Sequence, residues 1–270
     1  MGRKIVVALG IAGVLGDSGA GLSLCVFRRL RRLALWQLGA ALIAVNGYGQ
    51  TAVLRSPLEL LSTDPRAFAQ WLETERPQAV PEQDRAKILL TLPTEGEVTN
   101  LGAAPLRKLA ALGELLRASG HGSDYNIKVI DVPQARIGVF QRSVIVISEN
   151  ALALTDGEEL QALMAHELGH EYIWAEHQRA SERADDTRLK QLELMCDAIA
   201  IVILDGLGLD PSRLITGVEK ITRYNREFRG PVVDDRGYPT LSERRAFARA
   251  VTAWVAGATR TVAKPAILHK

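Results

Sequence analysis

The stretch His166-Glu167-Leu168-Gly169-His170 decides how the rest of this 270-residue chain is interpreted. Residues four positions apart lie on the same face of an α-helix, so both imidazoles would point toward one position in space. That spacing suits two ligands of a tetrahedral zinc ion, and the glutamate beside the first histidine suits a base for a water molecule that the ion activates. The sequence therefore predicts a zinc site held by His166 and His170, with Glu167 as the catalytic base.

The third ligand is expected on a second helix, because a catalytic zinc ion usually takes three protein ligands and keeps one position open. Residues 189–204 are strongly apolar, yet they include Glu193 and Asp197, which share a helix face. Carboxylates in so apolar a helix are costly unless they are paired or bind a metal. We predict that Glu193 is the third zinc ligand and that Asp197 holds the free N–H of a ligand histidine, His166.

Two further side chains are not assigned to the zinc site. His177 follows His170 by seven residues, more than a helical turn beyond the pair, and a solvated position is expected for it. The chain has two cysteines, Cys25 and Cys196. If the N-terminal segment that contains Cys25 is removed, Cys196 is left alone, and we expect the body of the protein to fold without a disulfide.

The first 49 residues have the pattern of an export signal. A basic cluster at 28–32 precedes the apolar stretch 33–45, whose length suits the hydrophobic region of a signal peptide better than a membrane span. Small residues follow at 46–49, where we expect cleavage. The alternative is an uncleaved membrane anchor with its basic cluster on the inner side. Both interpretations predict a periplasmic or cell-envelope protein, with inner-membrane association only through this segment.

The net charge of +2 hides an uneven distribution. Residues 1–50 contain six basic residues and one acid, so the other 220 residues carry 27 basic against 30 acidic side chains. A body without a basic surplus gives no argument for nucleic-acid binding. The composition, 47% hydrophobic and 24% charged, excludes a disordered or fibrous chain and is typical of globular proteins.

Hydrophobic periodicity predicts a mostly helical chain with one small sheet, which is an α+β fold. Capping boxes are expected at Thr155–Glu158 and at Thr240–Glu243, and residues 50–63 are interpreted as a linker. The expected strands cover 126–132, 136–140 and 143–148. The expected helices cover 64–73, 82–91, 105–119, 155–176, 189–204, 211–224 and 240–256.

These motifs together resemble a gluzincin of the HtpX and CAAX-prenyl-protease class over about residues 125–250. The resemblance rests on His166-Glu167-x-x-His170, on Glu193-x-x-x-Asp197, and on Tyr238-Pro239-Thr240 followed by Arg244. It implies a zincin-like metallopeptidase domain at 121–260, preceded by an N-terminal helical segment at 50–120 and followed by a tail at 261–270. In this chain Tyr238 replaces the histidine that the family usually has there, while Arg244 keeps the family's spacing.

The resemblance implies a zinc-dependent peptidase, expected to be an endopeptidase, that hydrolyses unfolded or envelope polypeptides. Tyr238 and Arg244 are the expected donors to the oxyanion of the intermediate. The substrate chain is expected to add a strand to an exposed sheet edge that precedes the active-site helix. That edge is assigned to the strand 143–148, with the contacts made by Ser143, Val144, Ile145 and Val146.

Two other functions remain open from the sequence. The first is a non-catalytic, zinc-stabilised envelope chaperone or assembly factor with a metallopeptidase fold, which the replacement by Tyr238 favours. The second is an intracellular regulatory protease that cuts a repressor, which the N-terminal segment argues against. The oligomeric state does not follow from the sequence.

Overall fold

The computed structural model of this chain describes residues 57–92, 96–229 and 237–262. Contacts divide the chain into Met1–Tyr48 and Gly49–Lys270, and all described residues belong to the second unit. The export signal or anchor predicted for residues 1–49 therefore lies outside the described residues, as does most of the predicted tail at 261–270. None of the helices in the described ranges has the length and apolar character needed to cross a membrane.

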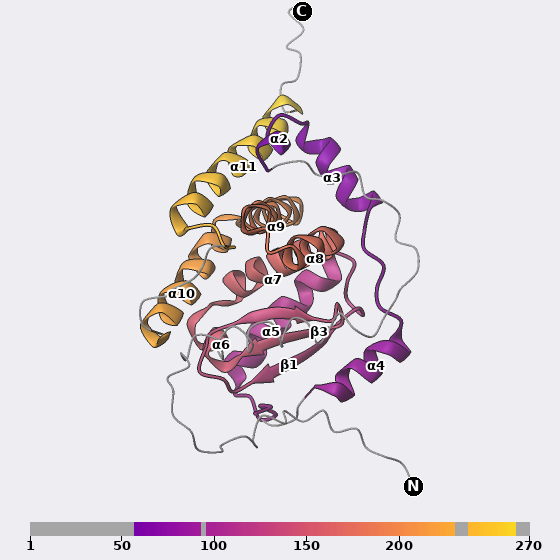
Figure 1. The fold of residues 1–270 in the computed structure, drawn as a ribbon, viewed down its shortest axis with the longest axis vertical. Coiled ribbons are helices and arrows are strands. Elements are labelled where there is room, and N and C mark those ends of the chain that lie inside the picture. Colours follow the sequence, from indigo (N-terminus) through magenta and orange to yellow (C-terminus); the bar gives the residue numbers. More distant parts are fainter. Residues whose placement is uncertain (1–56, 93–95, 230–236, 263–270) are drawn as a thin grey trace, which may run out of the picture. The chain divides into compact units, whose positions relative to one another are not determined.

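The described part of the chain is mostly helical and contains one small sheet, as the sequence predicts (Figure 1). The strands are β1 (Asn126–Ile130), β2 (Ile137–Phe140) and β3 (Val144–Ser148). The helices that precede the sheet are α2 (Pro57–Leu60), α3 (Pro65–Thr74), α4 (Glu82–Thr91) and α5 (Ala103–Ala118). Those that follow it are α6 (Glu149–Leu154), α7 (Gly157–Tyr172), α8 (Trp174–Glu182), α9 (Asp186–Gly206), α10 (Ser212–Arg229) and α11 (Leu241–Val262).

The strand order is β1-β3-β2, so β3 is the central strand of the sheet. It pairs in parallel with β1, where Asn126 faces Val144, and antiparallel with β2, where Ile137 faces Ile147. The sequence predicted that residues 143–148 form an exposed edge, and this prediction is wrong. The five apolar or small residues Val144–Ser148 are mostly buried, because β1 and β2 flank the strand and helices pack on the sheet.

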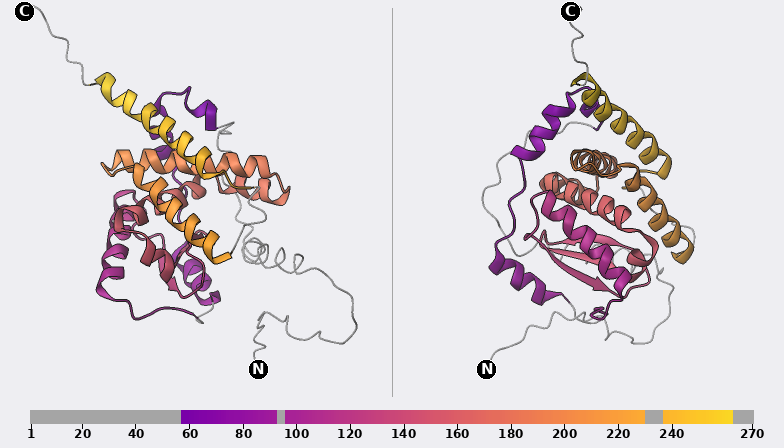
Figure 2. Two further views of the ribbon diagram at one scale, coloured as in Figure 1. Left: turned by 90° about the vertical axis from the view of Figure 1, so that its left-hand side faces the viewer. Right: turned by 180° about the vertical axis from the view of Figure 1, so that it is seen from behind.

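The helices form layers on the sheet and around α9. Helix α5 covers one face of the sheet and packs against α7, and α7 also contacts β2 (Figures 1 and 2). Helix α9 lies on α7 and is enclosed by α2, α3, α8 and α11. Its buried side chains include Leu192, Met195, Ile199 and Ile201, each at most 2% exposed. The predicted apolar helix is therefore central to the core, which also takes in Phe68 and Leu72 of α3.

Capping residues fix where the site-bearing helices begin. The side chain of Asp156 accepts from the backbone N–H of Glu159, whose carboxylate accepts from the N–H of Asp156. This capping box lies one residue later than the one predicted at Thr155–Glu158, because Asp156, not Thr155, is the N-cap. The box at Thr240 and Glu243 is confirmed by reciprocal hydrogen bonds of 2.6 and 3.2 Å.

Three short helices were not predicted. Helices α2 and α6 have four and six residues, too few for hydrophobic periodicity to be recognised. Helix α8 lies where one helix was expected to run to residue 176 and a charged segment to follow. The chain instead breaks at Ile173 (φ −112°, ψ 13°), which ends α7 and starts α8.

Gly169 allows α7 and α9 to approach closely. A Cβ atom on Gly169 would lie 2.8 Å from the Cα of Cys196, a backbone atom that cannot rotate away. Gly169→Ala is therefore expected to destabilise the protein by about 1–3 kcal/mol through overpacking, measured as the urea midpoint. Gly113→Ala in α5 is the matched control, because its Cβ would meet only the flexible Arg117 side chain at 3.4 Å. Equal stability of the two variants would contradict this account.

Candidate metal centre

Helices α7 and α9 place two histidines and a glutamate around one point. The rings of His166 and His170 are 5.0 Å apart between centroids and nearly perpendicular. The carboxylate of Glu193 lies 3.4 Å from His166 Nε2 through Oε2 and 3.6 Å from His170 Nε2 through Oε1. In a tetrahedral zinc site with bonds of about 2.0–2.1 Å, neighbouring donor atoms are about 3.3 Å apart. The contacts that Glu193 makes are therefore close to the spacing that zinc requires.

The outer side of His166 is fixed by a buried carboxylate. His166 Nδ1 lies 2.9 Å from Asp197 Oδ1, and Asp197 is fully buried. An ionised carboxylate only accepts hydrogen bonds, so Nδ1 carries a proton, and Nε2 is the ring nitrogen that faces Glu193. The structure thus brings His166 and Asp197 together as the sequence predicted.

Arg244 binds the same carboxylate from its other side. Its Nε donates to Asp197 Oδ2 at 2.8 Å, and its Nη2 donates to Asp197 Oδ1. The Arg244 side chain is 10% exposed, so this is a buried, bidentate ion pair. This geometry does not fit the predicted role of Arg244 as an oxyanion donor, because its guanidinium faces the Asp197 carboxylate that contacts His166 Nδ1.

Burial and charge set the pKa values of the three potential ligands. Burial would raise the pKa of Glu193, but the facing His170 and His166 outweigh it and lower this pKa to about 2. Burial lowers the pKa of His170 to about 3, although the facing charge of Glu193 opposes this shift. Burial also opposes protonation of His166, but hydrogen bonds to Asp197 and Glu193 raise its pKa to about 9. A cation at Nε2 of His166 would displace that proton, since metal binding requires the neutral ring.

Glu167 lies on the side of α7 that faces the sheet. A Cβ atom on Gly138 in β2 would be 3.9 Å from Glu167 Oε2, and the backbone N–H of Val139 hydrogen-bonds to the carboxylate. Burial, together with the nearby charge of Glu193, raises the pKa of Glu167 to about 7, although His166 opposes this shift. A carboxylate with a pKa near neutrality is suited to accept and release protons.

Tyr238 precedes the last helix, and its side chain is 52% exposed. The structure places it beside the buried Pro239, at the start of a described segment that follows residue 229 after a gap. Its predicted role as an oxyanion donor stays a prediction.

His177 does not lie in solvent as the sequence suggested. Its ring centroid is 5.2 Å from that of His170, at an interplanar angle of 87°. In an unbroken helix, residues seven apart are separated by about 10.5 Å along the axis. The chain breaks at Ile173 between α7 and α8, and the side chains of His170 and His177 lean together across the break. Sequence spacing missed this residue because it assumed one continuous helix.

Cys196 is a second donor that the sequence left unassigned. It is completely buried, and its sulfur and a ring nitrogen from each of His166 and His170 all lie within 4.8 Å of one another. Donor atoms of His170, His177 and Glu193 form a similar group within the same limit. The part of the chain that the structure describes therefore offers up to five donors around one region.

The edge of the sheet nearest to this region is β2. Arg136 O accepts from Ser148 N at 2.9 Å, so by the alternation of an antiparallel ladder the N–H and C=O groups of Ile137 and Val139 point away from β3. The side-chain amide of Asn225 in α10 pairs with both backbone groups of Ala135, at 2.9 and 2.8 Å. Within the described ranges, no strand pairs with the outer edge of β2.

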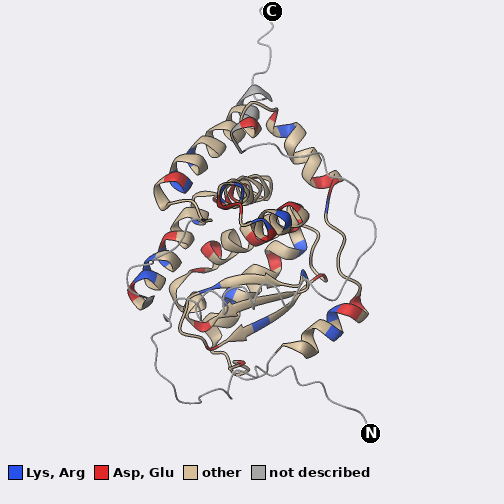
Figure 3. Cartoon of the chain, in the orientation of Figure 1, with Lys and Arg blue, Asp and Glu red and all other residues tan. Residues whose placement is uncertain are grey.

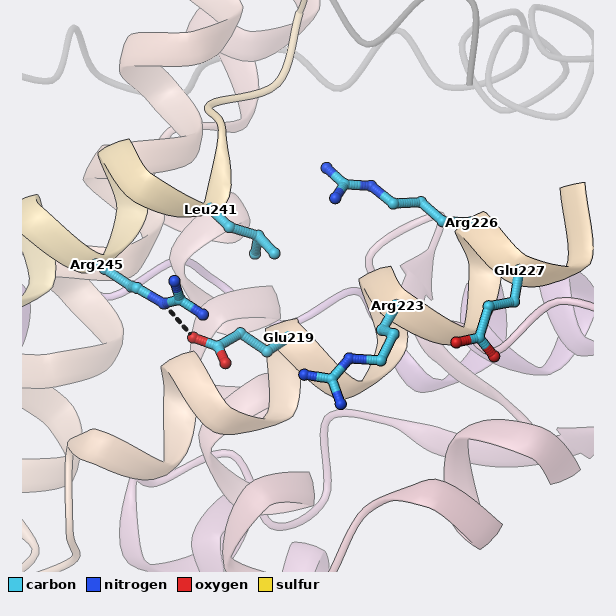
Figure 4. Close-up of a pocket in the computed structure, with 6 residues that line it drawn as sticks. All are labelled: Glu219, Arg223, Arg226, Glu227, Leu241 and Arg245. Carbon is cyan, nitrogen blue, oxygen red and sulfur yellow. Dashed lines mark hydrogen bonds and ion pairs between the residues drawn. The ribbon is translucent and has the colours of Figure 1, made fainter. Parts of the chain in front are cut away.

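A pocket between α10 and α11 differs in chemistry from the histidine site. Its lining is Glu219, Arg223, Arg226, Glu227, Leu241 and Arg245 (Figure 4), which includes no histidine or cysteine. Arg245 Nε lies 2.5 Å from Glu219 Oε1 across it. Basic residues outnumber acidic ones on both helices (Figure 3), and the residues that line this pocket are not part of the histidine site.

Comparison with known proteins assigns this region to a family. Residues 109–216, which include both histidines, Glu193 and Asp197, match the profile of peptidase family M48. No curated protein matches the chain at a significant level. The peptidases of this family depend on zinc, and the donor set found here suits that ion. This part of the chain is similar to the zinc metallopeptidases of family M48.

Proposed function

We propose that this protein is an endopeptidase that cleaves unfolded polypeptides, with zinc held by His166, His170 and Glu193. The observation that carries the proposal is the position of the Glu193 carboxylate, which lies within 3.6 Å of the Nε2 atoms of both histidines. When bound there, zinc supplies a Lewis acid that activates water and polarises the carbonyl of the scissile bond.

The protein's own residues supply the proton transfers. Glu167 accepts a proton from the attacking water and passes it to the leaving amine, as its pKa of about 7 allows. Asp197 and Arg244 act as positioning residues, because they hold the ring of His166 in one tautomer and orientation.

We place the substrate on the outer edge of β2 instead of on β3. An extended peptide would pair with the outward N–H and C=O groups of Ile137 and with the C=O of Val139, whose N–H already hydrogen-bonds to the carboxylate of Glu167. Asn225 already occupies the preceding position at Ala135 and would limit the length of the added strand. Pairing through main-chain groups accepts many sequences, which suits a protease that degrades unfolded chains.

The export predicted for residues 1–49 would place this activity in the periplasm or cell envelope. Fractionation of cells that express the full chain tests this location. Recovery of the chain in the cytoplasmic fraction would instead favour the intracellular regulatory protease.

Glu193→Ala tests the assignment of the third ligand. Loss of a residue that hydrogen-bonds to a zinc ligand weakens zinc binding by roughly 10–100-fold. Loss of the ligand itself should cost more, so the variant is expected to bind zinc more weakly than the wild type by a larger factor than this. Competition with a chromophoric chelator measures the dissociation constant, and Asp205→Ala, at the exposed end of the same helix, is the control. Unchanged zinc affinity in Glu193→Ala would show that the third ligand is misassigned.

Zinc binding without hydrolysis of any unfolded substrate by the wild type would favour the zinc-stabilised chaperone or assembly factor over a peptidase. This second function is worth testing because the exposed Tyr238 replaces the histidine that the family usually has at this position.

A further inference from the structure

We infer that His177 is a fourth protein donor to the metal, which closes the coordination of zinc in the resting enzyme. The inference rests on the zinc site proposed above and adds a ligand to it. A catalytic site keeps one position open, whereas a site with four protein ligands is closed to water.

The first support is the position of the imidazole. One donor atom each from His170, His177 and Glu193 lies within 4.8 Å of the other two. Two of these residues are already proposed as ligands, and their donor atoms are 3.6 Å apart. Small rotations of side chains, without movement of a helix, would bring His177 to the same ion.

The second support is that α8, the helix that carries His177, is anchored to the rest of the fold. Ile173 at the start of the helix and Ala180 near its end are each 4% exposed, so both ends are packed into the core. Glu176, the residue before His177, pairs with Arg188 of α9 at 2.7 Å, and both side chains are about four-fifths buried. His177 therefore lies on an anchored helix, and its contact with His170 is built into the packing of α8 on α9.

Cys196 competes with His177 for the role of fourth ligand, but its surroundings make it the less suitable of the two. Its Cβ would be 3.0 Å from a Cβ at Gly169, so the cysteine lies in the tight crossing of α7 and α9. His177 comes from a third helix, α8, and its side chain is only partly buried. The geometry thus makes His177 the donor that can approach the ion and leave it again when a substrate binds.

Such a closed state has a functional consequence. A substrate carbonyl or water could reach the zinc only after His177 moves away, so the resting enzyme would have low activity. Removal of the donor should open the site permanently. His177→Phe keeps a flat ring against His170 but has no ring nitrogen, which separates coordination from packing.

X-ray absorption at the zinc edge of the full-length, zinc-loaded chain tests the inference without reference to activity. The wild type is expected to show three imidazoles, and His177→Phe two imidazoles and an added oxygen. The variant should also bind zinc about 10-fold more weakly and hydrolyse an unfolded substrate several-fold faster. His177→Gln is measured in parallel in case Phe prevents folding, and Gln178→Ala on the same helix is expected to match the wild type.

Two imidazoles in the wild type, with an identical spectrum for His177→Phe, would overturn the inference while leaving the zinc peptidase intact. A zinc–sulfur distance of about 2.3 Å would assign the fourth position to Cys196 and would equally overturn it. Failure of the wild type to bind any zinc would instead refute the proposed function itself.

Discussion

Glu167→Gln is expected to reduce peptide hydrolysis by about 10²–10⁴-fold and to leave zinc bound, because the amide cannot accept the proton of the attacking water. The carboxylate is not one of the three proposed ligands, and its contacts are with the N–H of Val139 and the backbone of β2. Steady-state hydrolysis of an unfolded protein, together with zinc per chain, measures both effects.

The matched control for this variant is Glu158→Gln, at the start of the same helix. The Glu158 side chain is 58% exposed and pairs with Arg213, so its loss should change hydrolysis little. The acid limb of the wild-type pH profile should lie at or below pH 7, because burial raises the pKa of Glu167 to about 7 and a bound cation lowers it. Full activity of Glu167→Gln would refute the role of Glu167 as the base.

Arg244→Met is expected to cost about 3–5 kcal/mol of stability, because it leaves the carboxylate of Asp197 buried without its partner. For a protein of this size the melting temperature should fall by roughly 10 °C. Zinc affinity should also fall, by about 10–100-fold, since Asp197 would no longer be held against His166. Calorimetry and a chelator competition measure the two losses.

The adjacent Arg245 provides the control. Arg245 pairs with Glu219 on the surface, and Arg245→Met should leave the melting temperature nearly unchanged. The double variant Asp197→Leu/Arg244→Met should be more stable than Arg244→Met alone, because it removes the uncompensated charge. If Arg244→Met is as stable as Arg245→Met, the buried pair contributes nothing to the fold.

Much of the site could be predicted because it depends on spacing within single helices. His166 and His170 share one face of α7, and Glu193 and Asp197 share one face of α9, independently of the tertiary contacts. The apolar residues around Glu193 indicated that its helix is buried, and α9 is indeed enclosed by other helices.

The features that the sequence did not reveal depend on how elements meet. The order of strands follows from long-range pairing, and residues 143–148 form the central strand because β1 joins it in parallel. His177 reaches the site through a break at Ile173, a residue with no sequence signal for a helix end. Arg244 was assigned to the oxyanion by resemblance, whereas its bidentate pair with Asp197 could be seen only with both helices in place.

The most direct test of the central claim is the zinc content of the purified full-length chain, measured by elemental mass spectrometry after exchange into metal-free buffer. The arrangement of His166, His170 and Glu193 predicts about one zinc ion per chain, because donors at this spacing form a preorganised site. Absence of zinc, even after the metal is supplied, would contradict the account and leave the two histidines and the glutamate to be explained as packing alone.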